Sequence, residues 1–464
     1  MKGLLIISAL GLLAMLAEIF KVKKIILPLT LIGIIAALIA NYFEWNATMS
    51  ISYFDNMIVF DRPALAFSAI ILCTAFFWFI MANDYFHEDT NVADHYSLVL
   101  FALVGALMLT AFKNMTTLFL GVEILSIPLY VLAASKKGDI KSNEAGFKYL
   151  IMGSFASAVL LFGIALIYGA TGSFDIQTIS NYMANNEGNL PKFFHVGVIF
   201  MLIAFCFKVS AAPFHFWAPD VYEGSPTLIT ALMSTVVKTA AFAAIFKLFL
   251  LAFALSSPVW SSILALIIAL SLIISNFTAA TQSSVKRMLA YSSISHAAFM
   301  LMVVLANVRN NSSLDALIYY SLAYCGGSII AFAVLHVMSN NGGDDSFGSF
   351  NGLSKRNPML AFFMALAMLS LAGIPITAGF FGKYFVFTNM IGTPYKWLLI
   401  LAVLTSGVGV YYYMKVIIAM YFKNAEIDSA VEIKMPIKFT IIVAGLVTLI
   451  VGIVPGIVAQ LFKF

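Results

Sequence analysis

Two lysines stand in the middle of long apolar runs, on either side of a helix-breaking segment. Lys208 lies in one run and Lys238 in the next, and Pro213 follows Lys208 by five residues. An ionised lysine in the middle of a membrane costs about 2.5–3.5 kcal/mol on insertion scales. Proline removes one helical hydrogen bond and clashes with the preceding turn, so we expect freed carbonyl groups beside Lys208. This combination favours a site that moves protons.

One acidic residue accompanies the two lysines inside an apolar run. Glu123 occurs in the segment FLGVEILSIPLY, about two turns into the apolar run 115–134. Pro128 follows it by five residues, the same spacing as at Lys208, so we expect a local helix opening beside both groups. Burial brings the protonated and neutral forms of a lysine close in energy, and a nearby carboxylate favours the protonated form. A lysine paired with Glu123 would therefore keep its proton, and it would release the proton when the two groups separate.

Further ionisable residues support this interpretation less directly. Histidine titrates near neutrality, so His296, in the middle of an apolar run, suits a proton relay. His215, just past the first break, either carries protons or is a satisfied structural residue. Lys148 either lies at the membrane interface or joins the group around Glu123. We expect Lys247 to extend its amine to the interface from the end of its run. Two more ionisable residues have no assigned role: His336 and Lys415.

The composition indicates a polytopic membrane protein. The chain has 464 residues, of which 62% are hydrophobic and 10% charged. Apolar runs of about 17–25 residues recur from end to end, each long enough for a membrane-spanning helix. No glycine-rich phosphate loop, metal-ligand cluster or basic aromatic surface for nucleic acid occurs, so any chemistry takes place inside the bilayer. The three cysteines fit neither a metal site nor a disulfide framework: Cys73, Cys206 and Cys325.

We predict an all-α fold of about fourteen transmembrane helices. The expected spans are 3–20, 25–42, 64–81, 95–112, 115–134, 146–169, 193–216, 227–250, 258–280, 288–308, 314–339, 358–391, 396–422 and 437–462. The run at 358–391 is too long for one straight helix and contains LAGIPITAGFFGKY, so we expect two half-helices there, with Lys383 after the break. Helices seven and twelve are both interrupted near a lysine, which is typical of inverted-repeat transporters.

We predict four parts in the chain, with one interrupted helix in each of the two repeats. Three N-terminal helices (1–94) precede a first repeat of helices 4–8 (95–250), a second repeat of helices 9–13 (251–422), and a C-terminal loop with helix 14 (423–464). Because each repeat has an odd number of spans, the two would be inverted relative to each other. The first apolar run is expected to be a retained helix. Basic residues number thirteen in the loops opposite the termini and seven on the terminal side, which predicts that both termini are non-cytoplasmic.

Several of these segments resemble the antiporter-like membrane subunits of proton-pumping NADH:quinone oxidoreductase, respiratory complex I. The similar stretches are FKVSAAPFHFWAPDVYEGSPT followed by Lys238, SVKRMLAYSSISHAAF (Ser284–Phe299), and the segment Leu371–Phe385. The superfamily also includes subunits of multisubunit sodium/proton antiporters and membrane hydrogenases. Within it, WAPDVYEGSPT and the fourteen-span length resemble the subunit N group. The resemblance extends over essentially the whole chain.

The resemblance implies a proton path through two inverted five-helix units. It assigns the principal roles to Glu123, paired with Lys208, and to Lys238 and Lys383. It places three residues in a supporting polar axis: His215, His296 and Lys148. It also implies that this chain binds no cofactor, because NADH, FMN, iron–sulfur clusters and quinone belong to other subunits. The expected partners are M-like and K/J-like membrane subunits of a large hetero-oligomer in the bacterial inner membrane.

Two other functions stay open from the sequence. The chain could belong to a cation/proton antiporter of the Mrp type, in which case sodium would support ion flux. It could also be a non-conducting structural membrane subunit whose polar residues only hold helices together. Because no ring of carboxylates or carbonyl-rich sodium site occurs, protons are the favoured ion.

Overall fold

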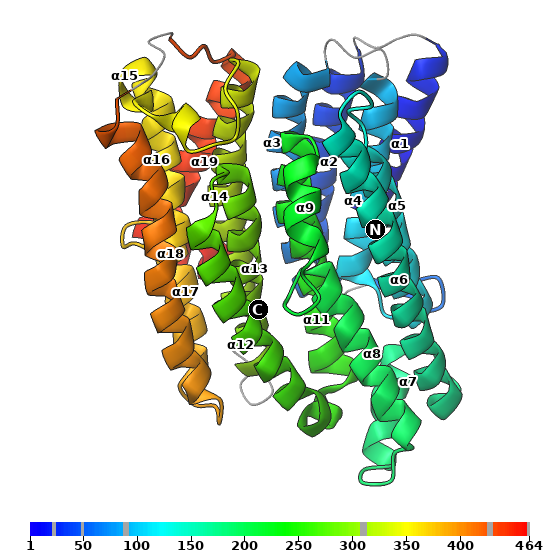
Figure 1. The fold of residues 1–464 in the computed structure, drawn as a ribbon. Coiled ribbons are helices and arrows are strands. Elements are labelled where there is room, and N and C mark those ends of the chain that lie inside the picture. Colours follow the sequence, from blue (N-terminus) through cyan, green and yellow to red (C-terminus); the bar gives the residue numbers. More distant parts are fainter. Residues whose placement is uncertain (21–24, 48–50, 87–91, 307–312, 425–429, 462–464) are drawn as a thin grey trace.

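The computed structural model describes residues 1–20, 25–47, 51–86, 92–306, 313–424 and 430–461, and these are almost entirely helical (Figure 1). The helices of the first half are α1 (Lys2–Ile19), α2 (Ile26–Trp45), α3 (Arg62–Phe86), α4 (Val92–Ala111), α5 (Met115–Ala133), α6 (Ile140–Thr171), α7 (Ile176–Asn185), α8 (Lys192–Lys208), α9 (Trp217–Gly224), α10 (Thr227–Leu232) and α11 (Lys238–Lys247). Two π-helical turns, η2 (Met233–Val237) and η3 (Leu248–Ala252), adjoin α11, and a hairpin of β1 (Ser52–Tyr53) and β2 (Ile58–Val59) precedes α3.

The second half continues with the 3₁₀ turn η4 (Ala254–Ser256), α12 (Ser257–Thr281), α13 (Val285–Ala306), α14 (Ser313–Asn340), η5 (Gly348–Phe350), α15 (Leu353–Arg356), α16 (Pro358–Ala372), α17 (Ala378–Met390), α18 (Lys396–Phe422), α19 (Met435–Ile453) and α20 (Gly456–Leu461). Figure 1 shows α1–α11 on one side of the molecule and α12–α19 on the other. The helices form an all-α bundle, as predicted.

Twelve spans in the described residues are long and apolar enough to cross a membrane. The predicted seventh span, 193–216, contains nearly all of α8 and the non-helical stretch that follows it, and α9 begins directly after. The predicted twelfth span, 358–391, contains α16 and α17, so both expected breaks are present. Together, twelve continuous spans and two broken ones account for the fourteen that the sequence predicts. The most buried spans are α13, α14 and the segment Thr227–Ala252. These form the centre of the bundle, and two of the predicted polar residues, Lys238 and His296, lie in them.

One expected helix opening is absent. The proline Pro128 lies inside α5, and the helix continues through it to Ala133, so the expectation of an opening beside Glu123 is wrong. The reason is the close packing of α5 against α4, where Gly105 leaves no space for a side chain against the backbone nitrogen of Leu125. A neighbouring helix that contacts the backbone this closely keeps α5 in place, which is how proline is tolerated in transmembrane helices.

Two pairs of loops are joined in the same way. Near the start of α5, Met115 N donates to Phe174 O at 2.8 Å, and near the start of α13, Val285 N donates to Asp345 O at 2.7 Å. A reciprocal bond accompanies each: Ile176 N to Lys113 O at 3.1 Å, and Phe347 N to Ser283 O at 3.2 Å. The two sets are offset by 170 or 171 residues (285 minus 115, 345 minus 174). We call them the first and second loop bridge.

The basic residues used to predict orientation are only partly described. Five lie outside the described residues: Lys21, Lys23, Lys24, Arg309 and Lys463. Lys286 is one of the thirteen basic residues expected in the loops opposite the termini, but it lies at the start of α13 and is buried. Its amine donates to the carbonyls of Glu223 at 2.9 Å and Ser225 at 2.5 Å. It therefore satisfies carbonyl groups at the end of α9 and does not face water.

Candidate functional site

Lys208 is the last residue of α8, at the point where the helix stops. Ser210 has a positive φ of 63°, which turns the chain away from the helix axis. The backbone nitrogen of Ala212 then donates to Ser271 Oγ on α12 at 2.8 Å, and the indole nitrogen of Trp217 donates to Phe207 O at 3.1 Å. Side chains from α9 and α12 thus satisfy backbone groups that the break would leave unpaired in the membrane. The break is a fixed part of the fold.

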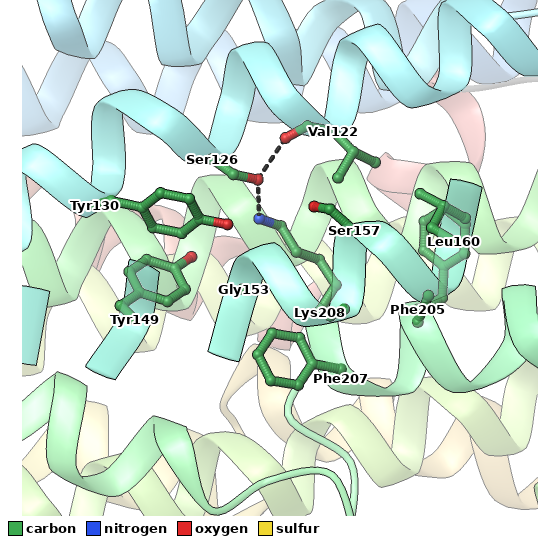
Figure 2. Close-up of a pocket in the computed structure, with 12 residues that line it drawn as sticks. Val122, Ser126, Tyr130, Tyr149, Gly153, Ser157, Leu160, Phe205, Phe207 and Lys208 are labelled. Atoms are coloured by element: carbon green, nitrogen blue, oxygen red, sulfur yellow. Dashed lines mark hydrogen bonds between the residues drawn. The ribbon is translucent and has the colours of Figure 1, made fainter. Parts of the chain in front are cut away.

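The amine of Lys208 points into a small cavity between α5, α6 and α8. Its Nζ donates to Ser126 Oγ at 2.6 Å, and Ser126 in turn donates to the carbonyl of Val122 (Figure 2). The Tyr149 ring lies 5.9 Å from the same nitrogen. The cavity has a volume of about 20 Å³, which is enough for one water molecule. Lys208 is 8% exposed, so this cavity is its main polar surrounding.

Glu123 lies on the same helix as Ser126 but does not pair with Lys208. In the described residues no carboxylate lies within 4.0 Å of Lys208 Nζ, and Glu123 Oε1 is buried without a hydrogen-bond partner. The structure therefore differs from the expected ion pair, because Ser126, three residues further along α5, is the group that contacts the amine. Sequence reasoning missed Ser126, although its i+3 spacing from Glu123 places both residues on one face of the helix.

Lys238 lies at the centre of the bundle, directly after the π-helical turn η2. It is 1% exposed, and its Nζ donates to Ser293 O at 2.7 Å and to Ser293 Oγ at 2.9 Å. Isolated π-helical turns occur frequently at functional sites. Neither η2 nor Ser293 was anticipated from the sequence, since Ser293 belongs to α13, which is distant in the chain.

His296 joins two tyrosines from different helices. Its Nδ1 lies 2.8 Å from Tyr320 Oη on α14, and its Nε2 lies 3.1 Å from Tyr413 Oη on α18. Tyr413 also hydrogen-bonds to Ser292. The imidazole therefore stands in a continuous hydrogen-bonded row of groups that can both donate and accept, which is the arrangement a proton relay needs.

Lys383 lies beside the second break. Its Nζ donates to Ala372 O, the last residue of α16, at 2.8 Å, and stands 5.1 Å from the Phe299 ring. Gly373 has a φ of +83°, and a Cβ there would lie 2.8 Å from Lys383 Cδ, so this position suits glycine for both reasons. A cation at the C-terminal end of a helix is favoured by the helix dipole. The break thus creates the acceptor that holds the lysine.

The other predicted residues lie in different surroundings. His215 is 4% exposed within the first break, and its Nδ1 has no hydrogen-bond partner. Lys148 lies away from Glu123: its amine contacts Glu144 at 2.7 Å and Asp220 at 2.8 Å. Lys247 is the last residue of α11. Its side chain is 6% exposed, because the amine pairs at 3.2 Å with Asp61, whose side chain is 35% exposed.

The carboxylates around Lys148 form a polar cluster that the sequence analysis missed. Arg287 Nη2 contacts Asp220 Oδ1 at 3.0 Å, and Arg287 Nη1 contacts Glu223 Oε2 at 2.5 Å. A cavity of about 160 Å³ opens among these side chains. We call it the polar cavity; its lining is Lys141, Glu144, Ala145, Lys148, Asp220, Glu223, Gly224 and Arg287. It joins α6 and α9 of the first half to α13 of the second.

Metal binding finds no support in the part of the chain that the structure describes. Within those ranges, His, Cys, Asp and Glu side chains do not gather in groups of three that could hold an ion. The arrangement is suited to hydrogen-bonded proton transfer and not to bond cleavage, because its ionisable side chains are amines and imidazoles held by neutral oxygens.

Comparison with known proteins identifies relatives over the full length of the chain. Residues 111–409 match the family described as NADH:quinone oxidoreductase/Mrp antiporter, TM. Curated proteins named NADH-quinone oxidoreductase subunit N are similar: that of Flavobacterium psychrophilum is 40% identical over 99% of this chain and 100% of its own, and that of Flavobacterium johnsoniae is 43% identical over 100% of both chains.

Solved structures agree with these relatives. A chain of respiratory complex I from Thermus thermophilus, solved with bound aureothin, has a TM-score of 0.82, 31% identity and 98% coverage of both chains. A chain of the Mrp complex from Dietzia has a TM-score of 0.87 at 18% identity, covering 99% of this chain and 95% of its own, and so shows the fold alone.

Proposed function

The chain belongs to the family of NADH-quinone oxidoreductase subunit N, and we propose that it moves protons across the membrane through a buried row of Glu, Lys and His side chains. As a subunit of that oxidoreductase, it contributes to an enzyme whose redox chemistry takes place elsewhere. The row comprises Glu123, Lys208, Lys238, His296 and Lys383. His215 and Lys148 have supporting roles.

One observation carries this proposal. Three lysines in the interior are each held by a neutral oxygen: Lys208 by Ser126, Lys238 by Ser293 and Lys383 by the carbonyl of Ala372. A carboxylate would hold the proton on a lysine, whereas a hydroxyl or carbonyl can accept from the ammonium, and a hydroxyl can also donate to the neutral amine. These partners therefore leave each lysine able to take up and release a proton.

The proposed path enters at the polar cavity and runs along the centre of the bundle. Lys148, Asp220 and Arg287 line the entrance. Glu123 approaches or leaves Lys208 as the complex works, which changes the balance between the two protonation states of the amine. The proton then passes by way of Lys238 and His296 to Lys383, with ordered water completing the connections.

Two inverted units are the architecture that we propose for this path, with the boundaries 95–250 and 251–422. The two loop bridges support it, because they repeat with the same offset at corresponding helix starts. The same offset of 170 residues relates Glu123 to Ser293 (293 minus 123) and Ser126 to His296 (296 minus 126). In each of these two pairs one member contacts a central lysine amine: Ser293 contacts Lys238, and Ser126 contacts Lys208.

We further propose the cellular setting. The chain lies in the bacterial inner membrane with both termini outside the cytoplasm, beside M-like and K/J-like membrane subunits. NADH, FMN, iron–sulfur clusters and quinone are bound by other subunits, and electron transfer among them drives the rearrangement of this chain. The family membership and the full-length similarity to subunit N proteins support this assignment.

The test is replacement of Lys208 in the assembled complex. We expect Lys208→Met to lower NADH-driven proton flux in proteoliposomes by roughly tenfold or more, because a positioned proton-transfer group typically contributes that much. Lys355→Met, at an exposed lysine on α15, is the matched control and should pump like the native complex. Full proton pumping by the Lys208 variant would contradict the proposed proton path and favour a non-conducting, structural role for this chain. A flux that requires sodium ions would favour the cation/proton antiporter.

A further inference from the structure

Two lysines outside the proposed row occupy corresponding places in the two halves. Lys247 is the last residue of α11, and Lys415 lies in the last third of α18. Their separation of 168 residues (415 minus 247) agrees within three residues with the offset of the loop bridges. Each lysine lies next to the loop bridge of its own half.

Lys247 is held beneath the first loop bridge. Its amine pairs with Asp61 Oδ2 at 3.2 Å, and Asp61 also accepts a hydrogen bond from Ala64 N at 2.9 Å at the start of α3. The hairpin before Asp61 is joined to the loop bridge, because Lys113 N donates to Met57 O at 2.9 Å. The lysine side chain is 6% exposed and that of Asp61 is 35% exposed. The positive end of the pair therefore faces the interior.

Lys415 is held beneath the second loop bridge. Its Nζ donates to Gln282 O at 3.0 Å and lies 4.3 Å from the centre of the Phe347 ring. Gln282 immediately precedes Ser283, and Phe347 N is the donor to that residue's carbonyl in the bridge itself. The lysine thus contacts both segments of the loop bridge, one through a hydrogen bond and the other through a cation–π contact.

Lys247 and Lys415 lie at opposite ends of the membrane-spanning region. Lys247 lies near the end of the span Thr227–Ala252, and the polar cavity, through Glu223, lies at the beginning of the same span. Lys286, one residue before Arg287 of that cavity, adjoins the second loop bridge at Val285. Lys415 is therefore on the side of the polar cavity, and Lys247 is on the other side.

We propose that Lys247 and Lys415 seal the closed ends of the two inverted units against passive proton leak. A proton path must never be open to both sides at once, or the gradient would collapse. The first unit opens at the polar cavity, so its far end needs a seal, and inversion places the equivalent seal of the second unit on the opposite face. A fixed positive charge at a constriction repels protons, as it does in other selective pores. This inference rests on the proposed proton path.

The experiment measures leak without catalysis. Proteoliposomes of the complete complex receive an imposed pH gradient, and its decay is followed by an entrapped pH dye with neither NADH nor quinone present. We expect Lys247→Met and Lys415→Met to speed the decay by roughly tenfold, the order expected when one positive charge no longer repels a proton nearby. Lys247→Arg and Lys415→Arg keep the charge and should seal like the native complex. Asp61 remains partly solvated in the Met variant, so folding should persist.

The outcomes separate this inference from the proposed function. If the Met variants retain the native leak while Lys208→Met abolishes pumping, the seal is wrong and the proton path stands. If Lys208→Met also pumps fully, the proton path itself is wrong and the seal falls with it. If the Arg variants leak like the Met variants, charge is not the sealing element and the inference is overturned. In the double variant Lys208→Met/Lys247→Met we expect native tightness, because the leak would need the same row of amines.

Discussion

The central lysines and His296 are hydrogen-bonded to neutral oxygens. Ser126, Ser293 and the two tyrosines around His296 bind the central groups without fixing their charge. By contrast, Lys148 and Lys247 pair with carboxylates at the two ends of the bundle. The division follows from solvent access, because a carboxylate near water can stay charged at low cost, whereas one in the interior would fix the proton.

The hydrogen bond from Lys208 to Ser126 can be tested by removing the serine hydroxyl. We expect Ser126→Ala to slow NADH-driven proton flux by roughly tenfold, because it removes a hydrogen bond to a charged group worth about 1.5–3 kcal/mol. Ser157→Ala is the control, since Ser157 lines the same cavity and Figure 2 shows no hydrogen bond from it to Lys208. Equal flux in the two variants would mean that Ser126 does not hold the amine during turnover.

The two broken helices are the elements that position the row. In each, a lysine lies at or near the break, and the neighbouring helices satisfy the backbone groups that the break frees. The second break depends on close contact between its halves: Gly379 N lies 3.2 Å from Ser370 Oγ, and the space beside Gly379 is taken by the backbone oxygen of Ser370. A side chain at Gly379 would therefore push α16 and α17 apart.

This contact predicts a stability effect. We expect Gly379→Ala to destabilise the subunit by about 1–3 kcal/mol or more, because the new methyl group overlaps a backbone atom that cannot move aside. Gly407→Ala is the matched control on α18, where nothing lies within 4 Å and alanine should be neutral or stabilise by about 0.4–1 kcal/mol. The measurement is the thermal unfolding of the purified complex. A Gly379 variant as stable as the Gly407 variant would contradict the proposed rigidity of the break.

At the scale of the whole molecule, inversion places equivalent structures on opposite membrane faces. Figure 1 shows the two halves side by side, with α7 near one end of the molecule and α15 near the other. Both lie in connections between corresponding helices of the two halves: α7 follows α6 and α15 follows α14. One set of loops should therefore face the cytoplasm and the other the outside.

Labelling of introduced cysteines tests this orientation. We expect Glu187→Cys, exposed between α7 and α8, to react in intact cells with a membrane-impermeant maleimide. Lys137→Cys, exposed between α5 and α6, should react only after the cells are opened. The native chain gives the background from its own three cysteines. The reverse pattern of labelling would place the termini in the cytoplasm and invert every side assignment made above.

The sequence determined the class of the protein, the number of spans and the two breaks. These depend on hydrophobic length and on proline and glycine positions, which act locally along the chain. It also singled out Lys208, Lys238, His296 and Lys383, because a charged or titratable group in an apolar run is conspicuous by itself.

Only the tertiary structure decided which partners these groups have. Ser293 lies in a helix remote in sequence from Lys238, and Asp61 precedes Lys247 by almost two hundred residues, so neither contact leaves a local pattern. How α5 and α8 pack likewise decides that Ser126, and not Glu123, contacts Lys208. The unbroken course of α5 through Pro128 depends on its neighbour α4. Packing between helices sets these distances, because the local sequence fixes the helices but not the side-chain contacts between them.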